Sequence, residues 1–160
     1  MRAVVITVSD RSAAGVRPDR SGPLLAELLA EAGAEVGEPV LVPDEPAEVT
    51  AVIRSAVEGG ADVVVTTGGT GLGPRDRTPE ATRAVLEREV PGVAEAIRAY
   101  GTAKTPFAAL SRGLAGVAGR TLVVNLPGST GGVRDGMAVL GPLLEHVVTQ
   151  LAGGDHPPAR

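Results

Sequence analysis

The stretch TTGGTGLGPRD, residues 66–76, has the residue types of a phosphate site. Its glycines carry no Cβ, so backbone amides can approach a ligand closely, and amides that point into one concavity bind anions. Asp76 ends the stretch, and a carboxylate beside a phosphate is repelled unless a cation lies between them. Mg²⁺ takes one or two carboxylates together with phosphate oxygens. The stretch therefore predicts an Mg²⁺-assisted phosphate site, although the glycines alone would equally suit a plain turn.

The nucleotide-binding motifs with fixed spacing do not occur in this stretch. A P-loop needs a lysine directly after its second glycine, and Lys104 is the only lysine of the chain. The Rossmann pattern G-x-G-x-x-G fails because Pro74 occupies its last position. Arg75, Arg77 and Arg112 could neutralise phosphate charge, or could simply be solvated surface residues. A phosphate site here would therefore be neither a P-loop nor a Rossmann fingerprint.

Two more polar, glycine-containing loops follow apolar runs, SDRSAAG at 9–15 and PGSTGG at 127–132. Ligands bind outside the carboxyl ends of parallel strands, so three such loops are expected at one edge of a sheet. Asn125 precedes the third loop and either contacts a ligand or pins a turn. Ser129 and the amides after it either bind an anion or cap the last helix. Asp44, which follows VLV, is either a second site carboxylate or a helix N-cap.

Short apolar, β-branched runs predict the strands that position these loops. They lie at 3–8, 62–67 and 121–126, with a less uniform fourth candidate at 35–42. Apolar residues at helical spacing predict helices between them, at 21–32, 46–58, 79–89, 92–100 and about 130–152. Thr78 is expected to cap the third helix, and Gly141-Pro142 to kink the last one.

Strands that alternate with helices predict an α/β fold with a mainly parallel sheet. The segment 107–124 contains three glycines and predicts a hairpin that adds an antiparallel strand. We expect one domain at 1–152 and a flexible tail at 153–160.

Composition excludes several functions. A formal net charge of −4 and an aromatic content of 1% argue against nucleic-acid binding, which favours a basic face or stacking rings. The absence of cysteine excludes disulfides and thiolate metal sites. With His146 expected to be structural and His156 in the tail, a multi-histidine metal site is not expected. No apolar run approaches the ~20 residues of a membrane span, so we expect a soluble, cytoplasmic protein without a membrane partner.

Six motifs resemble, in the same order, those of the MogA/MoaB family of molybdenum cofactor biosynthesis proteins. They are VSDRSAAG (8–15), VPDEP (42–46), TTGGTG (66–71), PRDRTPEAT (74–82), LSRGLAG (110–116) and NLPGSTGG (125–132). The resemblance implies a three-layer α/β/α fold, a homotrimer, and a relation to the G domain of gephyrin. MogA-type members join ATP and molybdopterin into adenylyl-molybdopterin, release pyrophosphate and require Mg²⁺. Their product then accepts molybdate, which implies a downstream molybdenum insertase as a partner.

The resemblance also implies roles for individual residues. Asp44 and Asp76 match the two catalytically important aspartates of the family, and both would contribute to the Mg²⁺ site. The glycine loop would hold the nucleotide phosphates, and Ser111 would lie near the pterin. The substrate-binding residues implied in this way are Ser9, Asp10, Thr67, Gly68, Gly69, Thr70, Gly71, Ser111, Arg112, Asn125, Pro127, Gly128 and Ser129.

Two other functions fit the same motifs. Some MoaB-type members lack adenylyltransferase activity, and PGSTGGVRDG at 127–136 lacks the insertion that some MogA-type proteins carry before the last helix. Such a protein would bind molybdopterin without transferring a group to it. A nucleotide-binding regulatory module would bind ATP regardless of molybdopterin and release no pyrophosphate. The presence of both Asp44 and Asp76 favours the enzyme, since binding alone does not obviously need two carboxylates.

Overall fold

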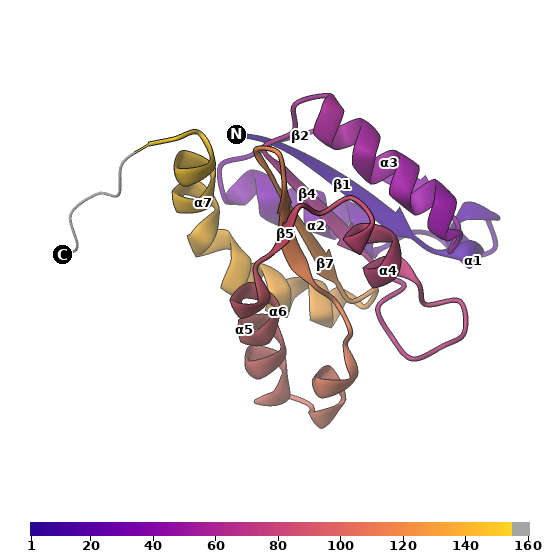
Figure 1. Ribbon diagram of the computed structural model, residues 1–160. Helices are drawn as coiled ribbons and strands as arrows, with labels where there is room; N and C mark the ends of the chain where they lie inside the picture. The colour runs from indigo at the N-terminus through magenta and orange to yellow at the C-terminus, as the bar shows by residue number, and fades with distance from the viewer. Residues whose placement is uncertain (155–160) are drawn as a thin grey trace.

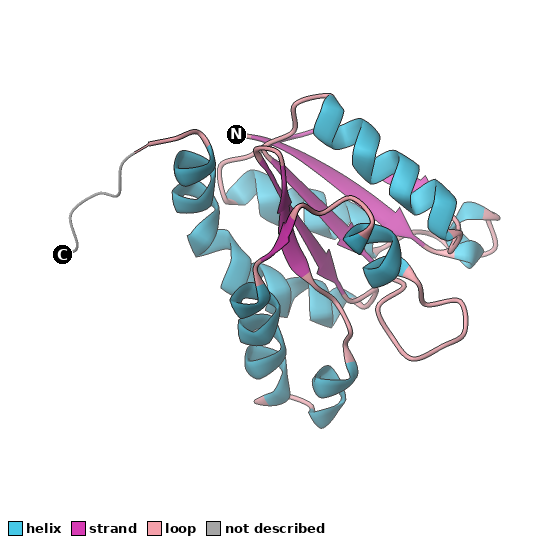
Figure 2. Ribbon diagram, viewed as in Figure 1, coloured by secondary structure: helices cyan, strands magenta, loops and turns pink. Residues whose placement is uncertain are grey.

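The computed structural model describes residues 1–154, and positions 155–160, which include His156 and most of the predicted tail, lie outside the described residues. A sheet runs through the middle of the molecule, with helices on both of its faces (Figure 1 and Figure 2). The predicted three-layer α/β/α fold with a mainly parallel sheet is therefore confirmed.

The parallel strands bring the predicted loops to one edge of the sheet. The strand order is β2-β1-β4-β7-β6-β5, with β3 also paired to β1. The parallel strands are β1 (Arg2–Val8), β2 (Glu35–Val36), β3 (Val40–Val42), β4 (Val63–Thr67) and β7 (Thr121–Leu126). Thr7 is aligned with Thr67, and Thr67 with Leu126. The carboxyl ends of β1, β4 and β7 therefore lie side by side.

The buried strands are apolar on both faces because each face is covered by helices. In β4, Val63 and Val65 face one side of the sheet while Val64 faces the other, as the two-residue period of a strand requires. The first side is covered by α2 (Ser21–Glu31), α5 (Pro91–Thr102), α6 (Thr130–Leu140) and α7 (Leu144–Leu151). The second side is covered by α3 (Pro46–Glu58) and α4 (Thr78–Arg83).

The predicted hairpin within 107–124 is confirmed. Its strands are β6 (Ala115–Ala118), which is antiparallel to β7, and β7 itself. Gly119 makes the turn with a φ of 57°, a value that favours glycine. A short 3₁₀ helix, η1 (Pro106–Leu110), precedes β6.

Two boundaries differ from the sequence-based expectation, and the expected kink of the last helix is found. The run 35–42 forms two short strands, β2 and β3, rather than one. The helix expected at 79–89 ends at Arg83, because the chain then joins the sheet. Glu87 N–H donates to Val117 O (2.9 Å), and β5 (Arg88–Glu89) pairs with β6. The antiparallel edge therefore has two strands. The helix expected at 130–152 is interrupted by the 3₁₀ turn η2 (Gly141–Leu143), where Pro142 cannot donate a hydrogen bond, so the expected kink is confirmed.

Candidate functional site

A cleft opens at the carboxyl ends of β1, β4 and β7, where the three predicted loops meet. Its volume is about 1180 Å³, above the roughly 300–1,000 Å³ of typical small-molecule sites. Segments 7–12, 67–71 and 127–132 line one part of it, and residues of α5 and η1 line the opposite part. Figure 1 shows the loop between β4 and α4 projecting at this end of the sheet. The cleft has room for more than one small substrate.

Most of the predicted site residues line this cleft, and two do not. Arg112 and Asn125 lie outside the lining. Those that line it are Ser9, Asp10, Asp44, Thr67, Gly68, Gly69, Thr70, Gly71, Asp76, Ser111, Pro127, Gly128 and Ser129.

The glycine loop is shaped by close approaches between the strand ends. Gly68 has a φ of 103° and Gly69 a φ of 63°, which other residues rarely adopt. A Cβ at Gly68 would overlap Val8 O, and a Cβ at Gly128 would lie 3.2 Å from Gly68 Cα. Gly68 also donates to Leu126 O (3.0 Å), which ties the loop to the end of β7. These glycines are required by the turn itself, whatever the loop binds.

Ser9 and Ser129 each cap a helix at the cleft. Ser129 accepts a hydrogen bond from Gly132 N–H (3.0 Å) at the start of α6, so the capping interpretation is confirmed. Ser9 accepts from Ser12 N–H (3.2 Å) and caps α1 (Asp10–Ala13) in the same way.

Asp10 and Asp44 hold each other through reciprocal hydrogen bonds. Asp10 N–H donates to Asp44 Oδ2 (2.8 Å), and Asp44 N–H donates to Asp10 Oδ1 (2.9 Å). Arg75 binds both oxygens of Asp10 and also Glu45 Oε1 (2.7 Å). The capping interpretation of Asp44 is wrong, because Glu45 occupies the N-cap position of α3 and Asp44 accepts from Asp10 instead.

The two carboxyl groups of this pair have opposite electrostatic environments. The hydrogen bond from Arg75 lowers the pKa of Asp10 below its ordinary value, with a further contribution from the Asp44 N–H. Burial raises the pKa of Asp44, and the nearby charges of Asp10 and Asp76 raise it further, against the effect of the Asp10 N–H. The Asp44 carboxylate is therefore the less well compensated of the two.

Asp76 closes the turn after the glycine loop. Gly73 N–H donates to Asp76 Oδ2 (2.8 Å), and Asp76 N–H donates to Gly73 O (3.0 Å). Within residues 1–154, neither Asp76 Oδ1 nor Asp44 Oδ1 takes part in a hydrogen bond. Each catalytic candidate thus keeps one carboxylate oxygen for a ligand.

The predicted N-cap role of Thr78 is wrong. Arg77 occupies the N-cap position of α4, and no side chain caps this helix. Thr78 is 1% exposed, and its Oγ1 is the one buried side-chain polar atom of the described residues that has no hydrogen-bond partner. We call Asp44, Asp76 and Thr78 the carboxylate cluster.

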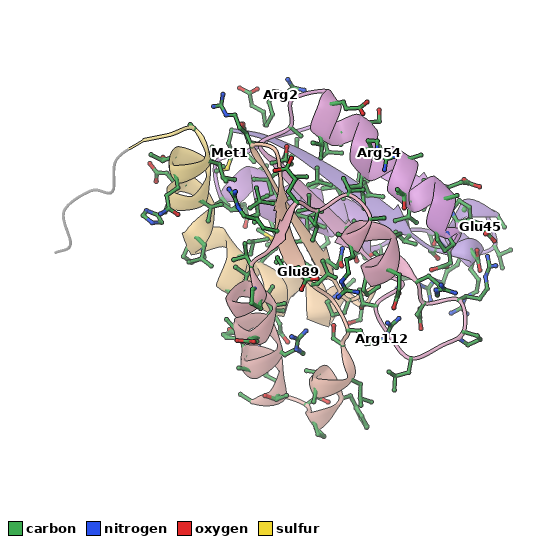
Figure 3. All side chains as sticks on the ribbon, in the orientation of Figure 1. Met1, Arg2, Glu45, Arg54, Glu89 and Arg112 are labelled. Carbon is green, nitrogen blue, oxygen red and sulfur yellow. The ribbon has the colours of Figure 1, made fainter. Side chains whose placement is uncertain are left out.

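Arg112 clamps the glycine loop instead of lining the cleft. It donates to Gly71 O (2.8 Å) and Asp76 O, and it forms an ion pair with Glu80. Figure 3 shows the labelled Arg112 beside α4 and the loop that precedes it. Arg112 lowers the pKa of Glu80 through this pair. In this structure Arg112 therefore holds the loop, and it does not line the cleft where we expected it to bind substrate.

Asn125 lies in the interior beneath the loops and is 4% exposed. Its Nδ2 donates to Thr66 Oγ1 (3.0 Å) and Thr82 Oγ1 (2.9 Å), and its Oδ1 accepts from Leu114 N–H (3.3 Å). Asn125 thus lies outside the cleft lining, and its three hydrogen bonds favour the interpretation as a structural residue. We call Asn125, Thr66 and Thr82 the Asn125 cluster.

Sequence reasoning missed Arg98, which lies in α5 and lines the cleft. Its guanidinium donates to Gly113 O (2.8 Å) and so holds the segment that carries Ser111. The sequence offers little signal for such a contact, since the acceptor is a backbone carbonyl on another element.

The donor set at the cleft suits a hard cation that also binds substrate. Within the described part of the chain, no group of three or more His, Cys, Asp or Glu side chains could hold a metal ion by itself. Mg²⁺, however, is usually bound by one or two carboxylates plus substrate phosphates. Asp44 and Asp76 line the cleft with their unbonded oxygens and fit that kind of site, and the buried Thr78 hydroxyl lies close to Asp44 beneath the glycine loop.

Residues 1–154 contain no helix that is both long enough and apolar enough to cross a membrane.

Comparison with known proteins gives consistent matches over most of the chain. The family model described as "Probable molybdopterin binding domain" matches residues 4–146. A "Molybdenum cofactor biosynthesis bifunctional protein" of Synechococcus elongatus is 46% identical over 154 residues, which cover 96% of this chain and 48% of that protein. The chain thus spans about half the length of this relative.

Two further proteins are similar along most of their own length. A "Molybdopterin adenylyltransferase" of Pyrococcus furiosus is 40% identical over 149 residues, which cover 90% of this chain and 87% of that protein. The crystal structure of the "Molybdopterin biosynthesis enzyme MoaB" from Thermus thermophilus has a TM-score of 0.88 and 50% identity, and the match covers 95% of this chain and 96% of that one. Because the family model and these similarities extend over the whole fold and its cleft, the chain belongs to the MogA/MoaB family of molybdenum cofactor biosynthesis proteins.

Proposed function

We propose that this protein is a molybdopterin adenylyltransferase, which transfers the adenylyl group of ATP to molybdopterin. The observation that carries the proposal is the position of Asp44 and Asp76. Both line one cleft beside the glycine loop, and each keeps one oxygen free of hydrogen bonds within residues 1–154. The 40% identity to an adenylyltransferase over most of the chain supports the same function.

The reaction requires alignment of the reacting phosphates and neutralisation of their charge more than it requires a general base. An oxygen of the molybdopterin phosphate bonds to the α-phosphorus of ATP, and the bond from that phosphorus to the β-bridging oxygen breaks. Pyrophosphate leaves with the electron pair. The attacking phosphate is already ionised, so the lack of histidine among the cleft-lining residues is no obstacle. The chain would contribute aligned groups that favour the charge of the transition state.

The cleft residues divide these tasks between its parts. The amides of the glycine loop would orient the nucleotide phosphates, and Ser111, on the α5 and η1 side, would contact the pterin. Asp44 and Asp76 would hold Mg²⁺. The ion would neutralise charge on the phosphate oxygens. Arg112 and Arg98 would keep the two parts in place through their bonds to backbone carbonyls.

Pyrophosphate release tests the proposal. The purified protein is incubated with ATP, Mg²⁺ and molybdopterin, and pyrophosphate is measured together with adenylyl-molybdopterin. We expect pyrophosphate only when all three are present, and none when EDTA removes the metal. Molybdopterin binding without pyrophosphate would show a binding protein instead. ATP binding that does not depend on molybdopterin, without pyrophosphate, would show a regulatory nucleotide-binding module.

The binding protein without transferase activity is the second candidate. The family resemblance carries it, because some MoaB-type members lack this activity. The MoaB structure from Thermus thermophilus is 50% identical to the chain. The retention of both carboxylates in the cleft favours the enzyme.

The remaining expectations concern the oligomeric state, the cellular compartment and the downstream partner. We propose a cytoplasmic homotrimer whose product passes to a separate molybdenum insertase. The strong exposure of Phe107 (75%) and Leu72 (67%) is consistent with further protein contacts near the cleft. Light scattering of the purified protein would give the mass of the assembly directly.

A further inference from the structure

The Thr78 hydroxyl is an exception among the buried side-chain polar atoms of residues 1–154. Among the described residues, it alone is a buried side-chain polar atom without a hydrogen-bond partner. A hydroxyl in that state loses its bonds to water without replacement, which destabilises the folded chain. An unsatisfied group of this kind often marks a functional site.

The hydroxyl lies against Gly69, and Asp44 approaches the same point of the glycine loop. A Cβ built on Gly69 would overlap Thr78 Oγ1 and would lie 3.1 Å from Asp44 Oδ1. Both oxygens therefore border the same point. Thr78 N–H also donates to Gly69 O (3.1 Å), which fixes the position of the residue against the glycine loop. Only a glycine without a side chain covers the hydroxyl on this side.

The charges around this point are negative and incompletely balanced. Asp44 and Asp76 both line the cleft beside the glycine loop, and each keeps one carboxylate oxygen without a hydrogen bond within residues 1–154. Arg75 is already paired with Asp10 and Glu45, and Arg112 with Glu80. A cation beside Asp44 would supply the missing charge.

We propose that Thr78 is a positioning residue of the cation site: its hydroxyl, together with Asp44 Oδ1, holds a water molecule of the hydrated divalent ion against the glycine loop. This inference rests on the proposed function, which places Mg²⁺ between Asp44 and Asp76. A water is the suitable partner for a recessed hydroxyl, because Mg²⁺ keeps several of its waters in protein sites. Groups that orient such outer partners typically change metal affinity 10–100-fold when they are removed.

The proposal predicts that loss of the hydroxyl raises the melting temperature of the metal-free protein and weakens its binding of the cation. Thr78→Val keeps the shape of the side chain and removes the unsatisfied oxygen, so the metal-free protein should melt about 3 °C higher. The same variant should need about tenfold more Mg²⁺ to reach the stabilised state. Thr78→Ser keeps the hydroxyl and should retain the wild-type Mg²⁺ midpoint, although it loses a methyl group from the interior.

Thr82→Val is the matched control, because Thr82 lies on the same helix and is 0% exposed. Its hydroxyl accepts from Asn125 Nδ2 (2.9 Å), so its removal leaves a buried donor unpaired. This variant should melt several degrees lower than the wild type while its Mg²⁺ midpoint stays unchanged.

The experiment follows the melting temperature of the four proteins while MgCl₂ is raised at constant ionic strength, with a fixed concentration of α,β-methylene-ATP. The analogue chelates Mg²⁺ equally in every sample, so differences between midpoints report the protein. A raised midpoint in Thr78→Val, with a wild-type midpoint in Thr78→Ser, supports the proposal. An unchanged midpoint in Thr78→Val, beside a wild type that responds to Mg²⁺, overturns it and leaves the proposed function intact. A wild type that does not respond to Mg²⁺ at all overturns the cation site itself, and with it both proposals.

Discussion

The carboxylate cluster and the Asn125 cluster lie at the same end of the sheet, yet their hydrogen bonds are satisfied to very different degrees. In the Asn125 cluster, the amide uses its oxygen and both amide hydrogens within the fold. In the carboxylate cluster, Asp44, Asp76 and Thr78 each keep an oxygen without a partner within residues 1–154. The first cluster is complete without a ligand, and the second is not.

Helix α4 contributes one threonine to each cluster, which makes the contrast sharper. Thr78 and Thr82 are four residues apart, on one face of the helix, and both are buried. Residue type, burial and helix are therefore the same, and only the partners differ. Burial alone therefore does not distinguish the two threonines, whereas the completeness of their hydrogen bonding does.

Replacing Asp76 should give the largest effect on the reaction. Asp76→Asn keeps an oxygen that can accept from Gly73 N–H but removes the charge that would hold Mg²⁺. We expect kcat/KM for pyrophosphate release to fall about 10²–10³-fold, with a melting temperature close to that of the wild type. Turnover near the wild-type rate would sink the assignment of Asp76 as a catalytic residue.

Asp44→Asn should lower activity somewhat less, by about 10²-fold. The amide oxygen can still accept from Asp10 N–H, so the reciprocal contact between the two loops is kept. The measurement is again pyrophosphate release, together with a melting curve. If the variant lost only thermal stability and kept its activity, Asp44 would belong with the structural residues, and the two clusters would no longer differ.

Replacing Asn125 should have the reverse outcome, with a loss of stability and little direct loss of chemistry. Asn125→Ala leaves two threonine hydroxyls and the Leu114 N–H without their buried partner. We expect the free energy of unfolding to fall by about 2–3 kcal/mol, measured by urea denaturation. At temperatures well below the transition, pyrophosphate release should remain close to wild type. A strong loss of activity in folded Asn125→Ala would return Asn125 to the substrate pocket.

The sequence correctly predicted that the three loops lie together at one edge of the sheet, because this prediction depends only on the direction of the strands. Apolar runs at 3–8, 62–67 and 121–126 identify buried parallel strands, and parallel strands place the loops after them together. The roles of Asn125 and Arg112 were not predictable in this way, because their partners come from distant elements. Arg112 meets Gly71 O and Glu80, more than thirty positions earlier in the chain.

The failed prediction at Thr78 has a more local cause. Thr-Pro before an apolar helical run is a typical N-cap pattern. Here, however, the backbone of Thr78 is bound to Gly69 O, and the helix already begins at Thr78. The end of the same helix was missed because pairing with β6 draws residues 88–89 into the sheet. Tertiary contacts thus override local propensity at both ends of α4.

The smallest expected effect is a difference between Asp10 and Asp44 in how each carboxylate changes the stability of the fold with pH. The pKa of Asp10 is lowered from 3.8, so Asp10 stabilises the fold above that pH and this contribution is lost as the pH falls through its folded pKa. The pKa of Asp44 is raised from 3.8, so its ionisation costs stability above the folded pKa, and this cost disappears as the pH falls below 3.8.

At pH 7 and low salt, Asp10→Asn should therefore melt below the wild type, and Asp44→Asn above it. Both differences should shrink toward zero as the pH is lowered past 3.8. Melting curves of the three proteins between pH 7 and pH 3 provide the test. Equal shifts of the same sign would mean that the two carboxylates have the same role. Opposite shifts would show that the Asp10 carboxylate stabilises the fold, while the Asp44 carboxylate destabilises it, as expected of a group that is kept for a ligand.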